Sequence, residues 1–325
     1  ILKNKGKIMS FTTKTKEAIL SSKQLDKPSV SFISAVIHTA GSLSYSSDGL
    51  GFEISSESKA LIIKTVKYIK DIFSIEQKII VDENSSLNKK NQYIAKYAGG
   101  FANEILLACK IIDRTEDFEI IFGIEESIFE TEQDEMNYII GAFLGSGTVS
   151  VPEVEGENGY HLEFAFTNGI MADDFASLLL RNGFNPKFAN RKDKCLIYFK
   201  DIENILNLLT YMKAMKSVIV INEIVAERQT RNLVNRQTNC ELANIDKTVK
   251  SAEKQIEAID YIEKSVGLDF LDDKLKEIAV LRRKHPDVSL EELGELLVPP
   301  ISKSGVNHRL RKLVSIATTI RGQNG

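Results

Sequence analysis

The chain has 325 residues, of which 43% are hydrophobic and 27% are charged, and its formal net charge is −3. Such a composition is typical of a folded globular protein with room for two or three domains, and it excludes a disordered or low-complexity chain. Nothing approaches the roughly 18 uninterrupted apolar residues of a membrane helix, so a membrane protein is not expected.

The N-terminus, ILKNKGKIM, is basic and no apolar segment follows it, so we expect no signal peptide and interpret residues 1–9 as an N-terminal extension. Met9 is a candidate natural start. The cysteines (Cys109, Cys195 and Cys240) and the four histidines have no metal-ligand spacing. We therefore expect no metal or cofactor, and we expect reduced, buried thiols in a cytoplasmic protein.

Residues 10–226 contain an internal repeat, with copies at about 10–112 and 136–226. Each copy has an apolar run with small residues, "FISAVIHTAG" or "YIIGAFLGSG", and then an alternating segment, "GFEIS" or "YHLEFAFTN". A second helix-like run follows, "SKALIIKTVKYIKDIF" or "GIMADDFASLLLRNGF". The pattern predicts two α+β units, with each segment of alternating hydrophobicity in a strand. Two unrelated helix–strand units are the alternative.

Small residues in the first helix of each copy indicate that the two helices approach closely, because longer side chains would separate their backbones. These residues are Ala35, Ala40 and Gly41 in the first copy, and Gly141, Gly145 and Gly147 in the second. A run from Asp113 to Glu135 that contains ten acidic residues and only one basic residue, Arg114, lies between the copies. It is interpreted as a solvated link or as a docking surface for a basic partner protein.

Residues 227–269 are predicted to be a helical linker, and the helical pattern extends from Val218 to Lys264 without a proline. Asparagines accumulate around Thr238, and their side chains compete for backbone hydrogen bonds, so a break near Thr238–Asn239 is expected. Arg228, Arg231 and Arg236 recur at helix-compatible spacing and are candidate auxiliary contacts to phosphate groups of DNA, alongside the C-terminal domain. Alternatively, they cap helix ends or pair with Glu223, Glu227 and Glu241.

Residues 270–325 are predicted to form three short helices. The first runs from about Asp272 to Lys284 and ends before Pro286. A capping box of Ser289 and Glu292 begins the second, which Pro299 and Pro300 end. Ser302 or Ser304 caps the third, whose apolar face is Val306, Leu310 and Leu313.

The remaining surface of the third helix is polar and basic, which is typical of a helix-turn-helix recognition helix. Its N-terminus, with Ser302 and Lys303, suits phosphate contacts. Asn can read adenine and Arg can read guanine, whereas His308 can contact either base or phosphate. The candidate DNA-binding residues are Ser302, Lys303, Ser304, Asn307, His308, Arg309, Arg311 and Lys312.

The distribution of charge indicates that the two parts of the chain have different functions. Residues 10–226 hold 22 basic and 30 acidic residues, a balance of −8, whereas residues 270–325 hold 10 and 7, a balance of +3. Only the C-terminal part is expected to be attracted to a phosphate backbone. A basic helical hairpin that binds no DNA is the alternative.

The two apolar runs resemble the signature helices of LAGLIDADG homing endonucleases. Together with "SLEELGELLVPPISKSGVNHRLRKL", the chain from Met9 to Ile316 resembles the WhiA family of bacterial transcription regulators. This resemblance implies an α+β fold, with a two-repeat LAGLIDADG homing-endonuclease-like body followed by an all-α helix-turn-helix domain. It also implies binding to double-stranded promoter or operator DNA, and roles in cell division, chromosome segregation or sporulation.

The homing endonucleases need a metal-binding carboxylate near the end of each signature helix. By alignment, Ala40 and Ser146 occupy these positions, so we expect an inactive nuclease scaffold and no enzyme. Asp48 and Glu153 follow the helices and are interpreted as solvated loop residues. The alternatives are an active metal-dependent endonuclease and a protein-interaction module that docks on the transcription machinery or a regulator protein.

Overall fold

The computed structural model describes residues 9–47, 49–83, 91–113, 119–152 and 159–323. Residues 1–8 of the expected N-terminal extension, Asp48 and Glu153 therefore lie outside the described part of the chain. The protein divides into two compact units, Ile1–Ala226 and Glu227–Gly325, each with its own hydrophobic core. Among the described residues, no helix combines the length and the apolar character needed to cross a bilayer.

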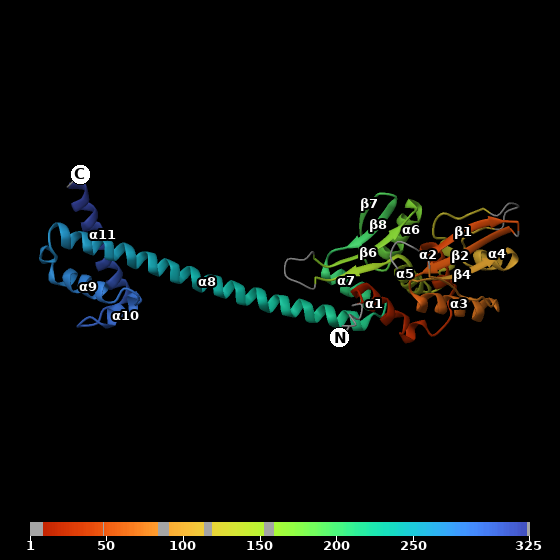
Figure 1. Ribbon diagram of the computed structural model, residues 1–325, viewed down its shortest axis with the longest axis horizontal. Helices are drawn as coiled ribbons and strands as arrows, with labels where there is room; N and C mark the ends of the chain where they lie inside the picture. The colour runs from red at the N-terminus through yellow and green to blue at the C-terminus, as the bar shows by residue number, and fades with distance from the viewer. Residues whose placement is uncertain (1–8, 48, 84–90, 114–118, 153–158, 324–325) are drawn as a thin grey trace. The chain divides into compact units, whose positions relative to one another are not determined.

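The first unit begins with α1 (Phe11–Leu20) and then contains two copies of one arrangement of helices and strands (Figure 1). The first copy consists of α2 (Val30–Ala40), β1 (Gly41–Ser46), β2 (Gly49–Ser56), α3 (Lys59–Phe73), β3 (Ile80–Asp82), β4 (Gln92–Ala98) and α4 (Gly99–Ala108). The second consists of α5 (Glu132–Ser146), β5 (Thr148–Ser150), β6 (His161–Phe166), α6 (Gly169–Arg181), β7 (Lys187–Arg191), β8 (Lys194–Phe199) and α7 (Ile202–Tyr211).

Both copies form a four-stranded antiparallel sheet with the same topology. The strand order is β1-β2-β4-β3 in the first sheet and β5-β6-β8-β7 in the second. In β6 the side chains of Leu162, Phe164 and Phe166 face the core, and the residues between them face outward, as the alternating pattern predicts. The predicted internal repeat and the α+β fold of the body are thus confirmed.

Helices α2 and α5 pack against each other between the two sheets (Figure 1). A Cβ atom at Gly141 would lie 2.8 Å from the Cβ of Ala35, and one at Gly145 would lie 1.9 Å from the Oγ1 of Thr39. These glycines permit the close approach predicted from the small residues. Gly41 and Gly147 do not contribute to it, because a Cβ there would instead meet the carbonyl oxygens of Ile37 and Phe143 in their own helices.

Helix α8 (Met215–Ser265) is continuous, so the break expected near Thr238–Asn239 was wrong. The asparagines cost helix propensity of only a few tenths of a kcal/mol each, and the segment contains neither Gly nor Pro. Side-chain pairs one turn apart, such as Gln237 with Glu241, add hydrogen bonds along the exposed surface. Cys240 is exposed on this helix and Cys195 of β8 is only partly buried, so the expectation of buried thiols is correct for Cys109 alone.

The second unit contains α8 from Glu227 onward together with α9 (Asp273–Lys284), α10 (Leu290–Glu295) and α11 (Lys303–Gln323). Its core joins Ile259 and Ile262 of α8 to the apolar faces of the three shorter helices. The all-α C-terminal part is confirmed, but α11 has 21 residues and is not the short helix that we predicted.

Candidate nucleic-acid interface

Helix α10 begins with the predicted capping box. The backbone N–H of Glu292 donates to the Oγ of Ser289 at 3.3 Å, and the backbone N–H of Ser289 donates to the Oε2 of Glu292 at 2.8 Å. The second of these bonds stabilises the ionised carboxylate and holds the pKa of Glu292 below its usual value. The start of the helix is therefore fixed by local sequence, as expected for a Ser-x-x-Glu motif.

The turn from α10 to α11 is closed by a contact between backbones. The N–H of Ile301 donates to the carbonyl oxygen of Gly294 at 3.1 Å. A Cβ atom at Gly294 would lie only 2.3 Å from the carbonyl oxygen of Ile301, so a glycine is required for this approach. Leu297 is 1% exposed and anchors the turn in the core of the second unit.

Helix α11 has the amphipathic pattern that the sequence predicts. Val306, Leu310 and Leu313 are fully buried against α9 and α10. The Oγ of Ser302 accepts from the N–H of Gly305 at 3.4 Å and lies 2.9 Å from the Oγ of Ser304. Ser302 therefore occupies the capping position, and the first N–H groups of α11 lack an intrahelical acceptor, as at any helix N-terminus, so an anion can bind there.

The first three turns of α11 carry the predicted DNA-binding side chains. Exposed residues are Ser302, Lys303, Ser304, His308, Arg311 and Lys312, and partly buried residues are Asn307 and Arg309. The Nζ of Lys312 lies 3.7 Å from the Oδ2 of Asp272, the capping residue of α9. Among the eight candidates, Lys312 is thus already engaged within its own domain.

Arg321, the last basic residue of the chain, has a structural partner. Its guanidinium group lies over the ring of Tyr261 in α8, 4.6 Å from the ring centroid. This contact attaches the C-terminal end of α11 to α8. The cationic surface of α11 that remains for a ligand lies in its N-terminal half.

The three auxiliary arginines lie on the part of α8 that belongs to the second unit. Arg231 forms an ion pair with Glu227 at 2.7 Å, which is one of the partners that we considered as the alternative to DNA contact. Arg228 is partly buried, and Arg236 is exposed. The three side chains therefore differ in burial, and Arg231 is engaged by a carboxylate of its own helix.

Arg282 was not predicted as a key residue, although its environment is unusual for an arginine. Its side chain is 1% exposed, its Nε donates to the Oε1 of Gln255 at 2.9 Å, and its Nη1 donates to the carbonyl oxygen of Val288 at 2.7 Å. Burial lowers its pKa below the usual value, while Asp287 acts in the opposite direction. Arg282 therefore connects α8 to the segment that precedes α10.

In the first unit, Ala40 and Ser146 are the final residues of α2 and α5. Their side chains offer a methyl group and a hydroxyl group, and the Oγ of Ser146 donates to the carbonyl oxygen of Ala142 at 3.4 Å. Lys16 donates to the carbonyl oxygen of Leu144 at 3.0 Å, and burial lowers its pKa to about 8 while Glu57 opposes this shift. Since that pKa is above 7, the ammonium form dominates at neutral pH and places positive charge at this end of α5.

A hydrogen bond between His38 and Tyr138 links α2 and α5. The Nδ1 of His38 lies 2.6 Å from the Oη of Tyr138, whereas the Nε2 is buried without a partner. Burial lowers the pKa of His38 to about 4, so its imidazole is neutral at pH 7. Among the described residues, no cluster of His, Cys, Asp or Glu has the arrangement of a metal site.

The acidic run between the two copies is partly used inside the first unit. Arg181 of α6 pairs with Glu135 at 2.6 Å and with Glu126 at 2.9 Å, and Asp134 caps α5 together with Thr131. Residues 114–118 of the run lie outside the described part of the chain. The run is therefore not only a solvated link, because several of its carboxylates hold α5 and α6 in place.

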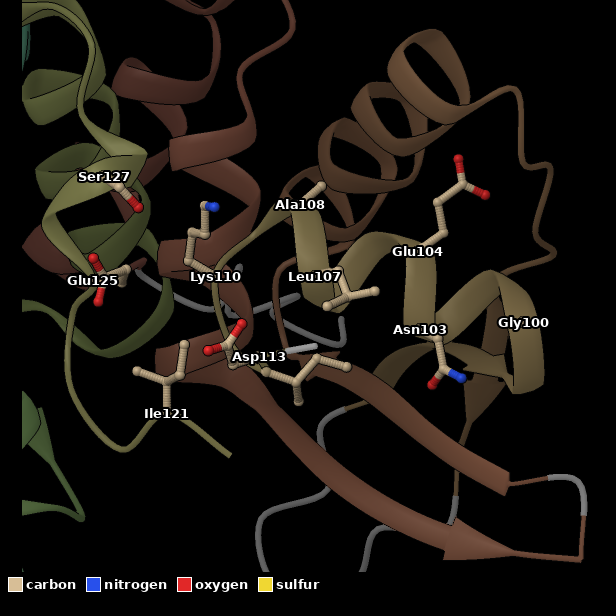
Figure 2. A pocket seen from close by; sticks show the side chains of 11 residues that line it. Gly100, Asn103, Glu104, Leu107, Ala108, Lys110, Asp113, Ile121, Glu125 and Ser127 are labelled. Carbon is tan, nitrogen blue, oxygen red and sulfur yellow. The ribbon is translucent and has the colours of Figure 1, made fainter. Parts of the chain in front are cut away.

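Other carboxylates of this region line a cavity of about 830 Å³ beside α4 (Figure 2). Leu107, Ala108, Ile112 and Ile121 supply its apolar walls. Glu104, Asp113 and Glu125 supply negative charge, and Lys110 is the basic residue among the lining side chains. This combination suits a basic group with an aliphatic stem.

Three family models match the chain. They describe the WhiA N-terminal LAGLIDADG-like domain (residues 27–112), the WhiA LAGLIDADG-like domain (residues 135–231) and the WhiA C-terminal HTH domain (residues 234–317). The crystal structure of full-length WhiA from Thermatoga maritima superimposes with a TM-score of 0.56 at 22% identity, covering 96% of this chain and 99% of that one. At this identity the likeness shows the fold alone.

Two curated relatives are similar over nearly their whole length, and both carry the name probable cell division protein WhiA. The protein from Clostridium tetani is 38% identical over 318 residues, which are 95% of this chain and 97% of the relative. The protein from Clostridium beijerinckii is 38% identical over 316 residues, which are 96% of this chain and 99% of the relative.

Proposed function

The chain belongs to the WhiA family, and on this premise we propose that it is a sequence-specific DNA-binding transcriptional regulator in which α11 reads the duplex. The observation that carries the proposal is the exposed N-terminal half of α11, whose polar face holds Lys303, His308 and Arg311. No acidic residue follows position 298, so nothing in this segment repels phosphate.

The side chains divide into two roles in this proposal. Ser302, Lys303 and Ser304 surround the N-terminus of α11, where N–H groups and positive charge suit a phosphate. Asn307, Arg309 and Arg311 lie one to two turns further along and suit base edges or the adjacent backbone. Lys312 also has Asp272 within 3.7 Å, so its contribution to DNA binding is expected to be smaller than that of Arg311.

Fluorescence anisotropy with the full chain tests the proposal on a duplex selected from random sequences and on a random duplex. Arg311→Ala is expected to weaken binding to both duplexes and to lower the slope of log affinity against log salt by about 0.9 if it meets one phosphate. Asn307→Ala is expected to reduce discrimination at one base pair by about 1–3 kcal/mol. Lys264→Ala, which removes an exposed lysine from the end of α8, is the matched control and is expected to bind normally.

Failure to select any preferred sequence would contradict the sequence-specific role. If Asn307→Ala behaved identically toward the selected and the random duplex, this residue would not read a base. If Arg311→Ala bound like Lys264→Ala, α11 would not be the contact surface.

We also propose that the LAGLIDADG-like body does not cleave DNA. The supporting observation is the chemistry at the ends of α2 and α5, where Ala40 and Ser146 offer no carboxylate for a divalent cation, while Lys16 adds positive charge. Supercoiled plasmid incubated with the full chain and Mg²⁺ or Mn²⁺ should remain supercoiled. Nicked or linear product that disappears with EDTA would support an active endonuclease.

The acidic cavity beside α4 is the place where we propose that a protein of the transcription machinery, or a regulator protein, docks on the body. A variant with Glu104→Gln and Glu125→Gln, which removes two negative charges from the cavity, should bind purified RNA polymerase holoenzyme more weakly than the unmodified chain in an anisotropy titration. A control variant with Glu227→Gln and Glu241→Gln has the same charge but alters α8 instead. Equal affinities of the two variants would remove the cavity as the docking site.

The regulated process is proposed from the relatives, which are named probable cell division proteins. We propose that the chain acts in the cytoplasm, at the nucleoid, on genes of cell division, chromosome segregation or sporulation. In a depletion strain, the unmodified chain should restore normal septum spacing, whereas Arg311→Ala should not. A fluorescent fusion that does not colocalise with DNA would contradict this placement.

A further inference from the structure

The turn between α10 and α11 presents an apolar tip. Val298 is 88% exposed, the highest fraction among the large hydrophobic side chains of the described residues, and its neighbour Leu296 is 46% exposed. Pro299 and Pro300 are exposed as well. The segment from Leu296 to Ser302 carries no charged residue.

Exposure of one valine is common on protein surfaces and by itself indicates nothing. The tip around Val298 differs from an ordinary exposed valine because the residues on both sides of it are fixed to the core of the second unit. Leu297 is buried before it, and Ile301 after it packs on the core and donates its N–H to Gly294. The prolines between these anchors have restricted φ angles, so ordering the tip against a ligand costs little conformational entropy.

The tip is also directly connected to the surface to which we assign phosphate contacts. Val298 precedes the capping residue Ser302 by four positions, and four residues span at most about 14 Å. The major groove of DNA is about 12 Å wide. When the N-terminus of α11 lies in the groove, Val298 is therefore within about one groove width of the phosphates and base edges that contact Ser302, Lys303 and Ser304.

In the major groove, an apolar side chain can contact the 5-methyl group of thymine, which distinguishes thymine from the other bases. We propose that Val298 is a specificity-determining residue that contacts the methyl group of a thymine beside the bases read by α11. This inference rests on the proposed function, since it requires α11 to enter the groove. It adds an apolar base contact to an interface that is otherwise polar and basic.

The test replaces each thymine of a selected duplex in turn by deoxyuridine, which removes only the methyl group. At one position the substitution should weaken binding of the full chain about threefold to fivefold, the effect of withdrawing one methyl group from an apolar contact. Val298→Ala should bind the thymine duplex correspondingly more weakly and should no longer distinguish thymine from deoxyuridine at that position. Val280→Ala, an exposed valine of α9 outside the turn, is the matched control and should behave like the unmodified chain.

Several results would overturn the inference while leaving the proposed function intact. These are a selected duplex with no methyl-sensitive thymine, or a Val298→Ala variant that keeps the full methyl discrimination. A Val298→Ala variant with unchanged DNA affinity but weaker binding to RNA polymerase would assign the tip to a protein contact instead. By contrast, if Arg311→Ala binds DNA normally or no duplex is selected, the proposed function fails together with this inference.

Discussion

At the scale of single residues, Arg282 shows how an arginine can be buried without a carboxylate in a direct hydrogen bond. Its guanidinium group donates to the Oε1 of Gln255 and to the carbonyl oxygen of Val288, both of which are neutral acceptors. The adjacent Arg283 is exposed and forms surface ion pairs with Glu263 and Asp260. Comparing substitutions of Arg282 and Arg283 therefore shows how much a buried arginine with neutral acceptors contributes to stability and how much an exposed arginine with charged partners contributes.

Arg282→Met is expected to destabilise the second unit by about 2–4 kcal/mol, because the buried Oε1 of Gln255 and the partly buried carbonyl oxygen of Val288 lose their donor. Arg283→Met should cost about 1 kcal/mol or less, since exposed ion pairs contribute little. Urea unfolding of the full chain, followed by circular dichroism, measures both changes. A larger loss for Arg283→Met than for Arg282→Met would contradict this interpretation of the buried contact.

His38 makes the stability of the first unit dependent on pH. Its pKa of about 4 in the folded protein lies below its usual value of about 6.5, so the folded state binds this proton less readily than the unfolded state does. The free energy of unfolding should therefore fall as the pH decreases from about 6.5 to about 4, by an amount on the order of 1–3 kcal/mol.

Unfolding of the unmodified chain and of His38→Gln at several pH values measures this contribution. The glutamine variant keeps a polar group near Tyr138 but cannot titrate, so the difference between the two chains isolates His38 from the carboxylates. The unmodified chain should lose stability relative to the variant across this window. A constant difference between pH 7 and pH 4 would show that His38 does not bind its proton differently in the two states.

At the scale of elements, the α10–α11 turn depends on the contact of Gly294 with Ile301. Gly294→Ala should destabilise the second unit by about 2–3 kcal/mol, because its Cβ would lie 2.3 Å from a backbone oxygen and the turn would have to shift. The change should also weaken DNA binding, since the turn positions the start of α11.

Gly322→Ala is the matched control within α11, because nothing lies within 4 Å of a Cβ at this position. It should leave the unfolding free energy unchanged or raise it by up to about 1 kcal/mol, since alanine is the better helix former. Thermal unfolding of both variants provides the comparison. Equal effects of the two substitutions would contradict the close approach in the turn.

Local motifs explain which elements could be predicted. The capping box at Ser289, the apolar runs of α2 and α5 and the apolar face of α11 depend on short spacings within one element, so the sequence predicts them well. The strands β1, β3, β4, β5, β7 and β8 were not predicted. The alternating burial of β4 and β8 is a signal that could have identified them, but β3 and β5 have only three residues each, and β7 is exposed along its whole length. Without one buried face, a strand lacks the regular alternation that identifies it.

The partners of individual side chains could not be predicted in the same way. The contact of Arg321 with Tyr261 joins residues 60 positions apart, and the pairing of Lys312 with Asp272 spans 40 positions. Both contacts arise from the packing of helices that are distant in sequence. The eight residues assigned to DNA were chosen from the amphipathic pattern of α11, and that pattern does not distinguish a free cation from one with a partner.

At the scale of the whole molecule, the central claim is that the two parts of the chain have different tasks. The second unit carries the cationic helix that we propose for DNA, and the first unit is the more acidic part of the chain. The first unit nevertheless has exposed lysines on its second sheet, including Lys187 of β7 and Lys194 of β8. Because both units have exposed lysines, protection of one set or the other by bound DNA shows which unit contacts the duplex.

Lysine footprinting of the full chain, with and without its selected duplex, tests this claim most directly. An amine-reactive reagent modifies exposed lysines, and mass spectrometry measures the modification of each one. We predict that the duplex protects Lys303 strongly while the reactivities of Lys187 and Lys194 stay unchanged. Protection of Lys187 and Lys194 with an unaltered Lys303 would place the duplex on the first unit and contradict the account.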